Sequence, residues 1–255
     1  MSRYALRFGA LGYLAALVVL PVGMVFYRAF EHGLAAAWDA VTTPPAQHAF
    51  YLTCVITLIA VPLNAIFGVL TALLLARGRF AGKRLLNAVI DLPFAVSPVI
   101  VGLALILVWG RNGWFGLSGV IFSLPGMVLA TIFVSLPFVV REVVPVLREE
   151  GTEQEQAAAT LGAGAWAVFR RITLPTIRWG LAYGVVLSTA RSLGEFGAVS
   201  AVSGKISGRT ETLTLFVEDR FQGYDLTGAY AASVVLALLA LATLALMTLL
   251  QRRSA

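Results

Sequence analysis

The hydrophobic positions of the chain fall into six long apolar stretches, and shorter segments between them carry most of the charged residues. Each stretch is close to the roughly 20 residues that a helix needs to cross the hydrocarbon core of a bilayer. The pattern therefore predicts an all-α, polytopic membrane protein with six transmembrane helices. The predicted spans are residues 8–30, 49–76, 86–109, 121–140, 179–202 and 226–250.

Lysine and arginine are distributed unevenly among the segments that connect these spans. With the N-terminus in the cytoplasm, the inner segments carry thirteen of them, the outer loops four and the spans two, which accounts for all 19. Cytoplasmic loops of membrane proteins hold an excess of these residues. The distribution therefore predicts that both termini are cytoplasmic.

The composition supports a membrane protein and narrows the choice of partners. Of the 255 residues, 59% are hydrophobic and only 13% are charged, against about 25% charged in an average soluble domain. The net charge of +6 follows from the inner-loop excess, so it gives no reason to expect a nucleic-acid partner. With Cys54 as the single cysteine, neither an intrachain disulfide nor a cysteine metal site is expected.

The longest predicted inner loop, about residues 141–178, is the one segment with the character of a soluble protein. It belongs to a core of residues 49–251, which follows the first span and first outer loop at residues 1–48. A run of small residues ends at Gly162, a position typical of a helix C-terminus, and a second helical stretch follows. On the residues alone, an ordinary solvated loop is the simpler interpretation. The residues that stand out in the loop are Glu155, Gln156, Ala157, Ala158, Gly162, Ile172, Leu174 and Pro175.

Two opposite charges, Arg191 and Glu195, lie inside the predicted fifth span. A charge at mid-membrane costs about 2.5–3.5 kcal/mol on the insertion scale, so both should face the bundle interior or water. Their spacing of four residues places them on one helix face, where they can pair. Gly194 and Gly197 permit a close approach or a bend there. A purely structural ion pair and a role in the transport path are both open.

The third predicted span contains an aspartate and two prolines. Pro93, Pro98 and Gly102 are consistent with a kinked helix near a pathway, and equally with a helix that only curves around its neighbours. Asp91 and Asn64 are further polar residues within spans. Either could line a conduit, whereas Asp91 lies near the inner end of its span and could simply reach the interface.

Two stretches of the chain resemble a known family. The inner-loop residues resemble the signature of ABC importer permeases, which is E-A-A, three residues, G, nine further residues and then I-x-L-P. Residues 192–213 resemble the W-type permease subunits of sulfate/thiosulfate importers within the sulfate/molybdate permease family. The resemblance implies the type I permease bundle, with the inner loop forming coupling helices that dock in a groove of an ATPase subunit. Gln156 stands where the signature has glutamate, with Glu155 one residue earlier, which puts a specific salt bridge from that position in question but not the docking.

The resemblance also implies a function and a set of partners. The chain would be the translocating subunit of an ATP-driven sulfate/thiosulfate importer in the cytoplasmic membrane of a prokaryote. Its partners would be a homologous second permease, two ATPase subunits, an extracytoplasmic sulfate-binding protein and membrane lipid. The chain lacks the G-x-x-x-x-G-K-[ST] of phosphate-binding loops, so ATP and magnesium are expected on the partner ATPase, with no cofactor and no enzymatic activity on this chain.

Other functions are open. A molybdate or tungstate importer permease would differ from a sulfate permease in the anion transported. Because the binding protein determines most of that specificity, the permease sequence leaves this alternative open. An ion-coupled carrier or channel could use Arg191, Glu195 and Asp91 as a relay, but it leaves the inner-loop pattern unexplained. An intramembrane enzyme would need a nucleophile and a base within the bilayer, and neither His32 nor His48 lies in a predicted span.

Overall fold

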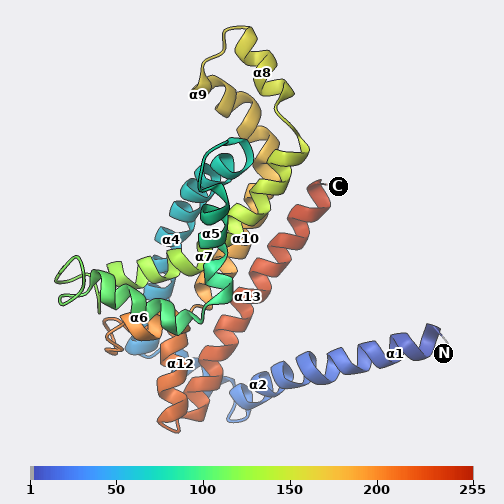
Figure 1. Cartoon of the computed structure of the whole chain (residues 1–255). Helices are drawn as coiled ribbons and strands as arrows, with labels where there is room; N and C mark the ends of the chain where they lie inside the picture. The colour runs from blue at the N-terminus through green and yellow to red at the C-terminus, as the bar shows by residue number, and fades with distance from the viewer. Residues whose placement is uncertain (1–2, 255) are drawn as a thin grey trace. The chain divides into compact units, whose positions relative to one another are not determined.

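The computed structural model describes residues 3–254, and Figure 1 shows them from the N-terminus to the C-terminus. Throughout this range the backbone forms helices and turns without a strand, which confirms the all-α prediction. The elements are α1 (Arg3–Leu14), the π-helical turn η1 (Ala15–Val19), α2 (Leu20–Phe30), α3 (Leu34–Val41), α4 (Pro44–Arg77), α5 (Lys83–Ala95), α6 (Pro98–Trp109), α7 (Leu124–Glu149), α8 (Glu153–Thr160), α9 (Ala165–Val168), the π-helical turn η2 (Phe169–Thr173), α10 (Leu174–Leu193), α11 (Gly197–Val202), α12 (Leu213–Gln222) and α13 (Leu226–Ser254).

Four of the six predicted spans are continuous helical segments long and apolar enough to cross a membrane. In the described part of the chain these segments are Arg7–Phe30, Pro44–Arg77, Leu124–Glu149 and Leu226–Leu249. The fourth predicted span begins at Leu124 and continues as far as Glu149, so the start of the predicted inner loop belongs to helix α7. The bilayer length rule thus identified these four segments, although their ends differ by several residues.

The third and fifth predicted spans are each broken into two helices. Helices α5 and α6 are bent by 118° relative to each other. The break lies at Ser97, whose ψ of 132° is extended, because a residue before proline is disfavoured in the helical region and Pro98 begins the next helix. The fifth predicted span ends as α10 at Leu193 and resumes as α11 at Gly197. The six-span count therefore stays a prediction for these two segments.

By their close contacts, the residues form two units. Among the described residues, one unit comprises residues 3–52 and 206–238, and the other comprises residues 53–205 and 239–254. Helices α4 and α13 each contribute to both units. The division at residue 48 drawn from the sequence stays a prediction.

In the first unit, a long N-terminal helix precedes a small packed core. Side chains from Arg7 to Met24 are exposed, as expected of a segment whose neighbours would be lipid. The π-helical turn η1 ends at Val19, two residues before Pro21, which cannot donate a backbone hydrogen bond. The small core joins α4, α12 and α13 through the buried residues Ala46, Ala49, Leu213, Phe216 and Ala232.

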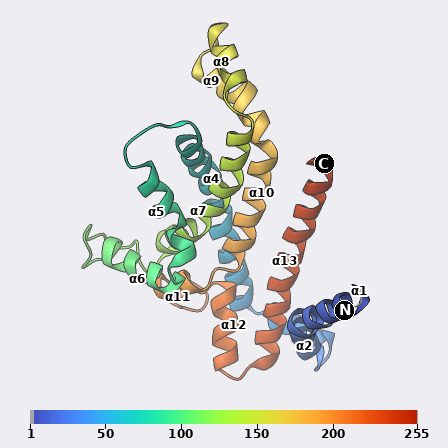
Figure 2. The same cartoon turned by 45° about the vertical axis from the view of Figure 1, so that its right-hand side comes forward.

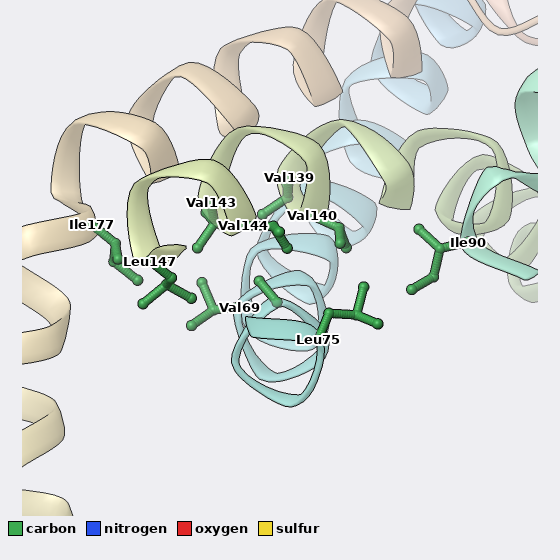
Figure 3. Close-up of a cluster of buried hydrophobic side chains, with 10 residues drawn as sticks. Val69, Leu75, Ile90, Val139, Val140, Val143, Val144, Leu147 and Ile177 are labelled. Carbon is green, nitrogen blue, oxygen red and sulfur yellow. The ribbon is translucent and has the colours of Figure 1, made fainter. Parts of the chain in front are cut away.

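In the second unit, helix α7 is the central element. It runs alongside α10, as Figures 1 and 2 both show, and it also contacts α5 and α6. Two glycines of α10 permit the close approach: a Cβ atom on Gly184 would lie 2.8 Å from the Cα atom of Val139, and one on Gly180 would lie 2.9 Å from the carbonyl oxygen of Glu142. Figure 3 shows the apolar cluster beneath α7, where valines meet Leu75 of α4 and Ile177 of α10.

The contact between the two broken spans gives a test of the fold. A Cβ atom on Gly102 of α6 would lie 2.6 Å from the carbonyl oxygen of Ala198 and 2.6 Å from the Cβ atom of Ala201 in α11. Alanine ordinarily favours a helix over glycine by about 1 kcal/mol, but overpacking here should cost about 1–3 kcal/mol. Gly102→Ala should therefore lower the melting temperature of the purified protein. Gly23→Ala, a helical position with nothing within 4 Å, is the control, and equal melting temperatures for both variants would contradict the close packing.

Candidate functional site

The inner-loop motif forms a short helical hairpin at one end of the second unit. Figure 1 shows α8 and α9 beyond the neighbouring ends of α7 and α10. Helix α8 ends in a Schellman motif, in which the Gly162 amide donates to the Ala159 carbonyl and the Ala163 amide donates to the Ala158 carbonyl, each at 3.0 Å. Gly162 has a φ of +85°, which L-residues with a side chain rarely adopt. The predicted helix end at Gly162 is therefore confirmed, with Leu161 as the C-cap and Gly162 directly after it.

The tip of this hairpin presents large apolar side chains to the surroundings. Leu161 is 90% exposed and Trp166 is 71% exposed. The Trp166 ring stacks on the ring of Phe169, with the ring centroids 5.6 Å apart, so its position is held from one side. Exposed apolar groups gathered in this way indicate a protein interaction site rather than a solvated loop.

Glu155 ties the hairpin to the long helices. Its Oε2 atom lies 3.2 Å from Nε of Arg77 at the end of α4, and its Oε1 atom accepts a hydrogen bond of 2.9 Å from the Thr173 hydroxyl in η2. Arg77 also donates, through Nη1, to the carbonyl oxygen of Leu147 in α7 at 2.6 Å. These contacts, here called the Glu155 latch, connect α8 with α4, α7 and the start of α10.

The other signature residues have local roles. Gln156 is exposed and its side-chain amide donates to the Thr152 hydroxyl at 2.9 Å, so in this structure Glu155 makes the interhelical ion pair. Ala157 is exposed and Ala158 is half-buried. At the far end of the motif, Ile172 is half-buried, Leu174 packs against the apolar cluster, and Pro175 is exposed in the first turn of α10.

The predicted pairing within the fifth span is present and joins its two helices. Arg191 Nη1 lies 2.7 Å from Glu195 Oε2, and Glu195 Oε1 accepts a hydrogen bond of 2.7 Å from the Ala198 amide in the first turn of α11. Glu195 is only 3% exposed, whereas the Arg191 side chain is 30% exposed. Gly194 caps the end of α10, and a Cβ atom on Gly197 would lie 2.8 Å from Cβ of Pro98.

Asp91 has a different partner. Arg141 of α7 donates from Nε to Oδ1 of Asp91 at 2.8 Å and forms an ion pair with the second carboxylate oxygen. Both side chains are partly exposed, 42% for Asp91 and 36% for Arg141. Asp91 and the pair formed by Arg191 and Glu195 therefore belong to separate ion pairs on different helices.

A polar cluster that the sequence analysis did not assemble lies between α4, α7 and α10. The Asn64 side chain is fully buried, and its amide donates to the Ser135 hydroxyl at 2.7 Å and, at 3.4 Å, to the Ser188 hydroxyl. Ser192 in turn donates to Ser135 at 3.2 Å. The spacing of four between Ser188 and Ser192 was the available signal, since it places both hydroxyls on one face of α10. We call this group the Asn64 cluster.

Glu211, in the first unit, is a buried carboxyl outside the helices. It is 3% exposed, and burial raises the pKa of its carboxyl, while a hydrogen bond with Ser207 acts in the opposite direction.

Within the described residues, no group of three or more histidine, cysteine, aspartate or glutamate side chains is placed to hold a metal ion.

Comparison with known proteins gives consistent matches over nearly the whole chain. The family described as "Binding-protein-dependent transport system inner membrane component" matches residues 33–255. The "Sulfate transport system permease protein CysW" of Synechocystis sp. is 51% identical over 99% of this chain and 94% of its own length. The protein of the same name from Escherichia coli K12 is 48% identical over 94% of this chain and 84% of its own.

Two further matches extend this picture. The "Sulfate transport system permease protein CysT" of Salmonella typhimurium is 40% identical over 88% of this chain and 84% of its own length. Among solved structures, a chain of a bacterial ABC transporter involved in the import of the acidic polysaccharide alginate superposes with a TM-score of 0.80, covering 98% of this chain and 94% of that chain. Its sequence identity is 19%, so it shows the fold alone.

The Glu155 latch predicts a measurable difference between two neighbouring glutamates. Glu155→Ala should remove the ion pair with Arg77 and weaken the attachment of α8 by about 1–2 kcal/mol, so amides of α8 should exchange with deuterium about tenfold faster. Glu153→Ala removes an exposed carboxylate from the same helix and serves as the control. Hydrogen exchange of residues 153–173 that is equally fast in both variants would contradict the latch.

Proposed function

The chain belongs to the family of binding-protein-dependent transport system inner membrane components, and from that premise we propose that it is the permease subunit of an ATP-driven importer of sulfate and thiosulfate. The observation that carries the proposal is the identity of 48–51% to sulfate transport permeases over nearly the full length of the chain. The helical hairpin between α7 and α10, with its exposed apolar tip, supplies the attachment that such an importer needs.

The partners follow from the same premise. The similarity to proteins named CysW and also to proteins named CysT supports a homologous second permease subunit. One solved relative was determined in complex with a pentasaccharide-bound periplasmic protein, which supports an extracytoplasmic binding protein as the source of the anion. Two ATPase subunits would complete the importer. They would hold ATP and magnesium, and this chain would carry neither cofactor nor catalytic residue.

The charge distribution supports one orientation in the membrane. The multi-pass chain would have both termini in the cytoplasm, because the inner segments hold thirteen lysine and arginine residues against four in the outer loops. The hairpin of α8 and α9 then faces the cytoplasm, where the ATPase subunits are. The Arg191 and Glu195 pair lies between that side and the outer loops.

In the proposed mechanism, the hairpin passes ATPase movement to the helices. Leu161 and Trp166 would insert into a groove of the ATPase subunit, so closure of the ATPase dimer would displace the hairpin. The Glu155 latch would transmit that displacement to α4 and α7, and the Asn64 cluster would keep α4, α7 and α10 moving together. The bundle would thereby alternate between outward-open and inward-open arrangements.

The groups inside the spans would bear on the path of the anion. Glu195 is occupied by Arg191 and by the Ala198 amide, which supports a structural role for the carboxylate. The partly exposed Arg191 guanidinium retains donors that could meet an oxyanion. The residues that would line or gate the path are Arg191, Gly194, Glu195, Gly197 and Asp91.

Two alternatives make different predictions. A molybdate importer permease would share the fold and the hairpin, but the relatives at 48–51% identity are named for sulfate. An ion-coupled carrier or channel would work without ATPase subunits. It would therefore give the hairpin no function, and it does not fit the family to which the chain belongs. Sulfate import is therefore the better supported function.

Uptake of labelled sulfate tests the proposal. Cells that lack this gene should lose sulfate uptake and regain it when the chain is restored, and excess unlabelled thiosulfate should block the restored uptake. Molybdate in the same excess is the matched competitor and should have little effect. Unchanged sulfate uptake in the deleted strain, together with reduced molybdate accumulation, would assign the chain to the molybdate importers instead.

A further inference from the structure

A basic cavity lies in the second unit, apart from the hairpin tip and from the Arg191 and Glu195 pair. Its volume is about 630 Å³, and it lies between the end of α4, the start of α5 and one face of α7. Its polar lining consists of Lys83, Arg84, Asn87, Arg141 and Arg148. The cavity lies on the side of the protein that the lysine and arginine distribution assigns to the cytoplasm.

The cations of the cavity exceed the anions that could neutralise them. None of its lining residues is a carboxylate. Arg141 is paired with Asp91, and Lys83 Nζ donates to the Gly78 carbonyl at 3.0 Å. Among the described residues, Arg84 and Arg148 have no ion-pair partner.

The start of helix α5 adds to this positive charge. Its N-cap is Gly82, with a φ of +96° and no side-chain hydrogen bond to the first turn. Lys83 and Arg84 occupy the first turn, and no acidic residue does. Cations at a helix N-terminus are unfavourable, because the positive end of the helix dipole is there, and an anion at the same place is favourable.

The general excess of cations on the cytoplasmic side does not explain this arrangement. This excess accounts for the presence of lysine and arginine in inner segments. It does not require that these residues converge on one cavity, or that two of them occupy the N-terminal turn of a helix, where cations are unfavourable. A spacing of seven residues puts Arg141 and Arg148 on the same face of α7, two turns apart. The cavity therefore collects charge from two helices that are separate in the sequence.

We infer that this cavity binds a tetrahedral oxyanion group. Arg84 and Arg148 would donate charge-assisted hydrogen bonds to its oxygens, with the Asn87 amide and the first turn of α5 completing the site. The group has two possible sources, inorganic sulfate on the cytoplasmic side of the importer or the phosphate of an anionic lipid. The first source rests on the proposed function, whereas the second does not.

Binding to the complete importer tests this inference. The importer, with its partner permease and ATPase subunits but without binding protein or ATP, is placed in nanodiscs of phosphatidylcholine, and bound radioactive sulfate is measured. In a second arm, native mass spectrometry measures the phosphatidylglycerol retained from nanodiscs that contain both lipids. The variants are Arg84→Gln with Arg148→Gln, the charge-retaining Arg84→Lys with Arg148→Lys, and Arg79→Gln as the control. Arg79 is exposed in the loop between α4 and α5 and does not line the cavity.

The wild-type importer should bind sulfate, phosphatidylglycerol or both. The double glutamine variant should lose affinity by about tenfold or more, while Arg79→Gln binds like the wild type and the double lysine variant retains binding. Sulfate binding that phosphatidylglycerol displaces identifies the lipid phosphate as the occupant, and binding that it leaves unchanged identifies the inorganic anion.

Three results would overturn the inference: no binding of either probe by the wild type, equal binding by the double glutamine variant, or an equal loss in Arg79→Gln. If the double glutamine variant fails to fold, the single variants Arg84→Gln and Arg148→Gln decide, and wild-type binding by both would count against the site. Cellular sulfate uptake reports on the proposed function separately, so the failure of one can be told from the failure of the other.

Discussion

The ion pair between Arg77 and Glu155 is the contact on which the position of the hairpin depends. Its two side chains are 21% and 22% exposed, so water screens the pair only partly and the loss of one partner would leave a poorly solvated charge. Glu155 also accepts a hydrogen bond from the Thr173 hydroxyl, and Arg77 also donates one to the Leu147 carbonyl. The hairpin is thereby joined at once to α4, α7 and the start of α10, and it cannot move without moving these elements or breaking the pair.

Within the membrane-spanning helices, close packing and a few hydrogen bonds keep the same three helices together. Hydrogen bonds between membrane helices average about 0.6 kcal/mol, so the Asn64 cluster is better understood as fixing the register of α4, α7 and α10 than as the main source of their stability. The glycines of α10 that meet α7 allow the larger contribution, from van der Waals packing. A movement delivered to the hairpin should therefore reach the bundle as the displacement of one body.

Local features were predictable from the sequence, and contacts between distant residues were not. Hydropathy identified four of the spans as continuous helices, because a bilayer imposes a length on an apolar helix. Gly162 predicted the end of α8, and the spacing of Arg191 and Glu195 predicted their pairing, because both depend on helix geometry alone. The same reasoning could not find Arg77 as the partner of Glu155, 78 residues away. Pro98 suggested a kink, but neither its extent, a bend of 118°, nor the close packing of Gly102 against α11 could be predicted from the sequence.

The ratio of sulfate ions imported to ATP molecules hydrolysed tests most directly whether the Glu155 latch passes ATPase movement to the helices. It would be measured in proteoliposomes that contain the complete importer and its binding protein, with wild-type, Glu155→Ala and Glu153→Ala permease. Glu155→Ala should lower the ratio, because ATPase movement no longer reaches α4, while Glu153→Ala should keep the wild-type ratio. An unchanged ratio in Glu155→Ala, or hydrolysis that imports no sulfate even with the wild-type chain, would contradict this mechanism.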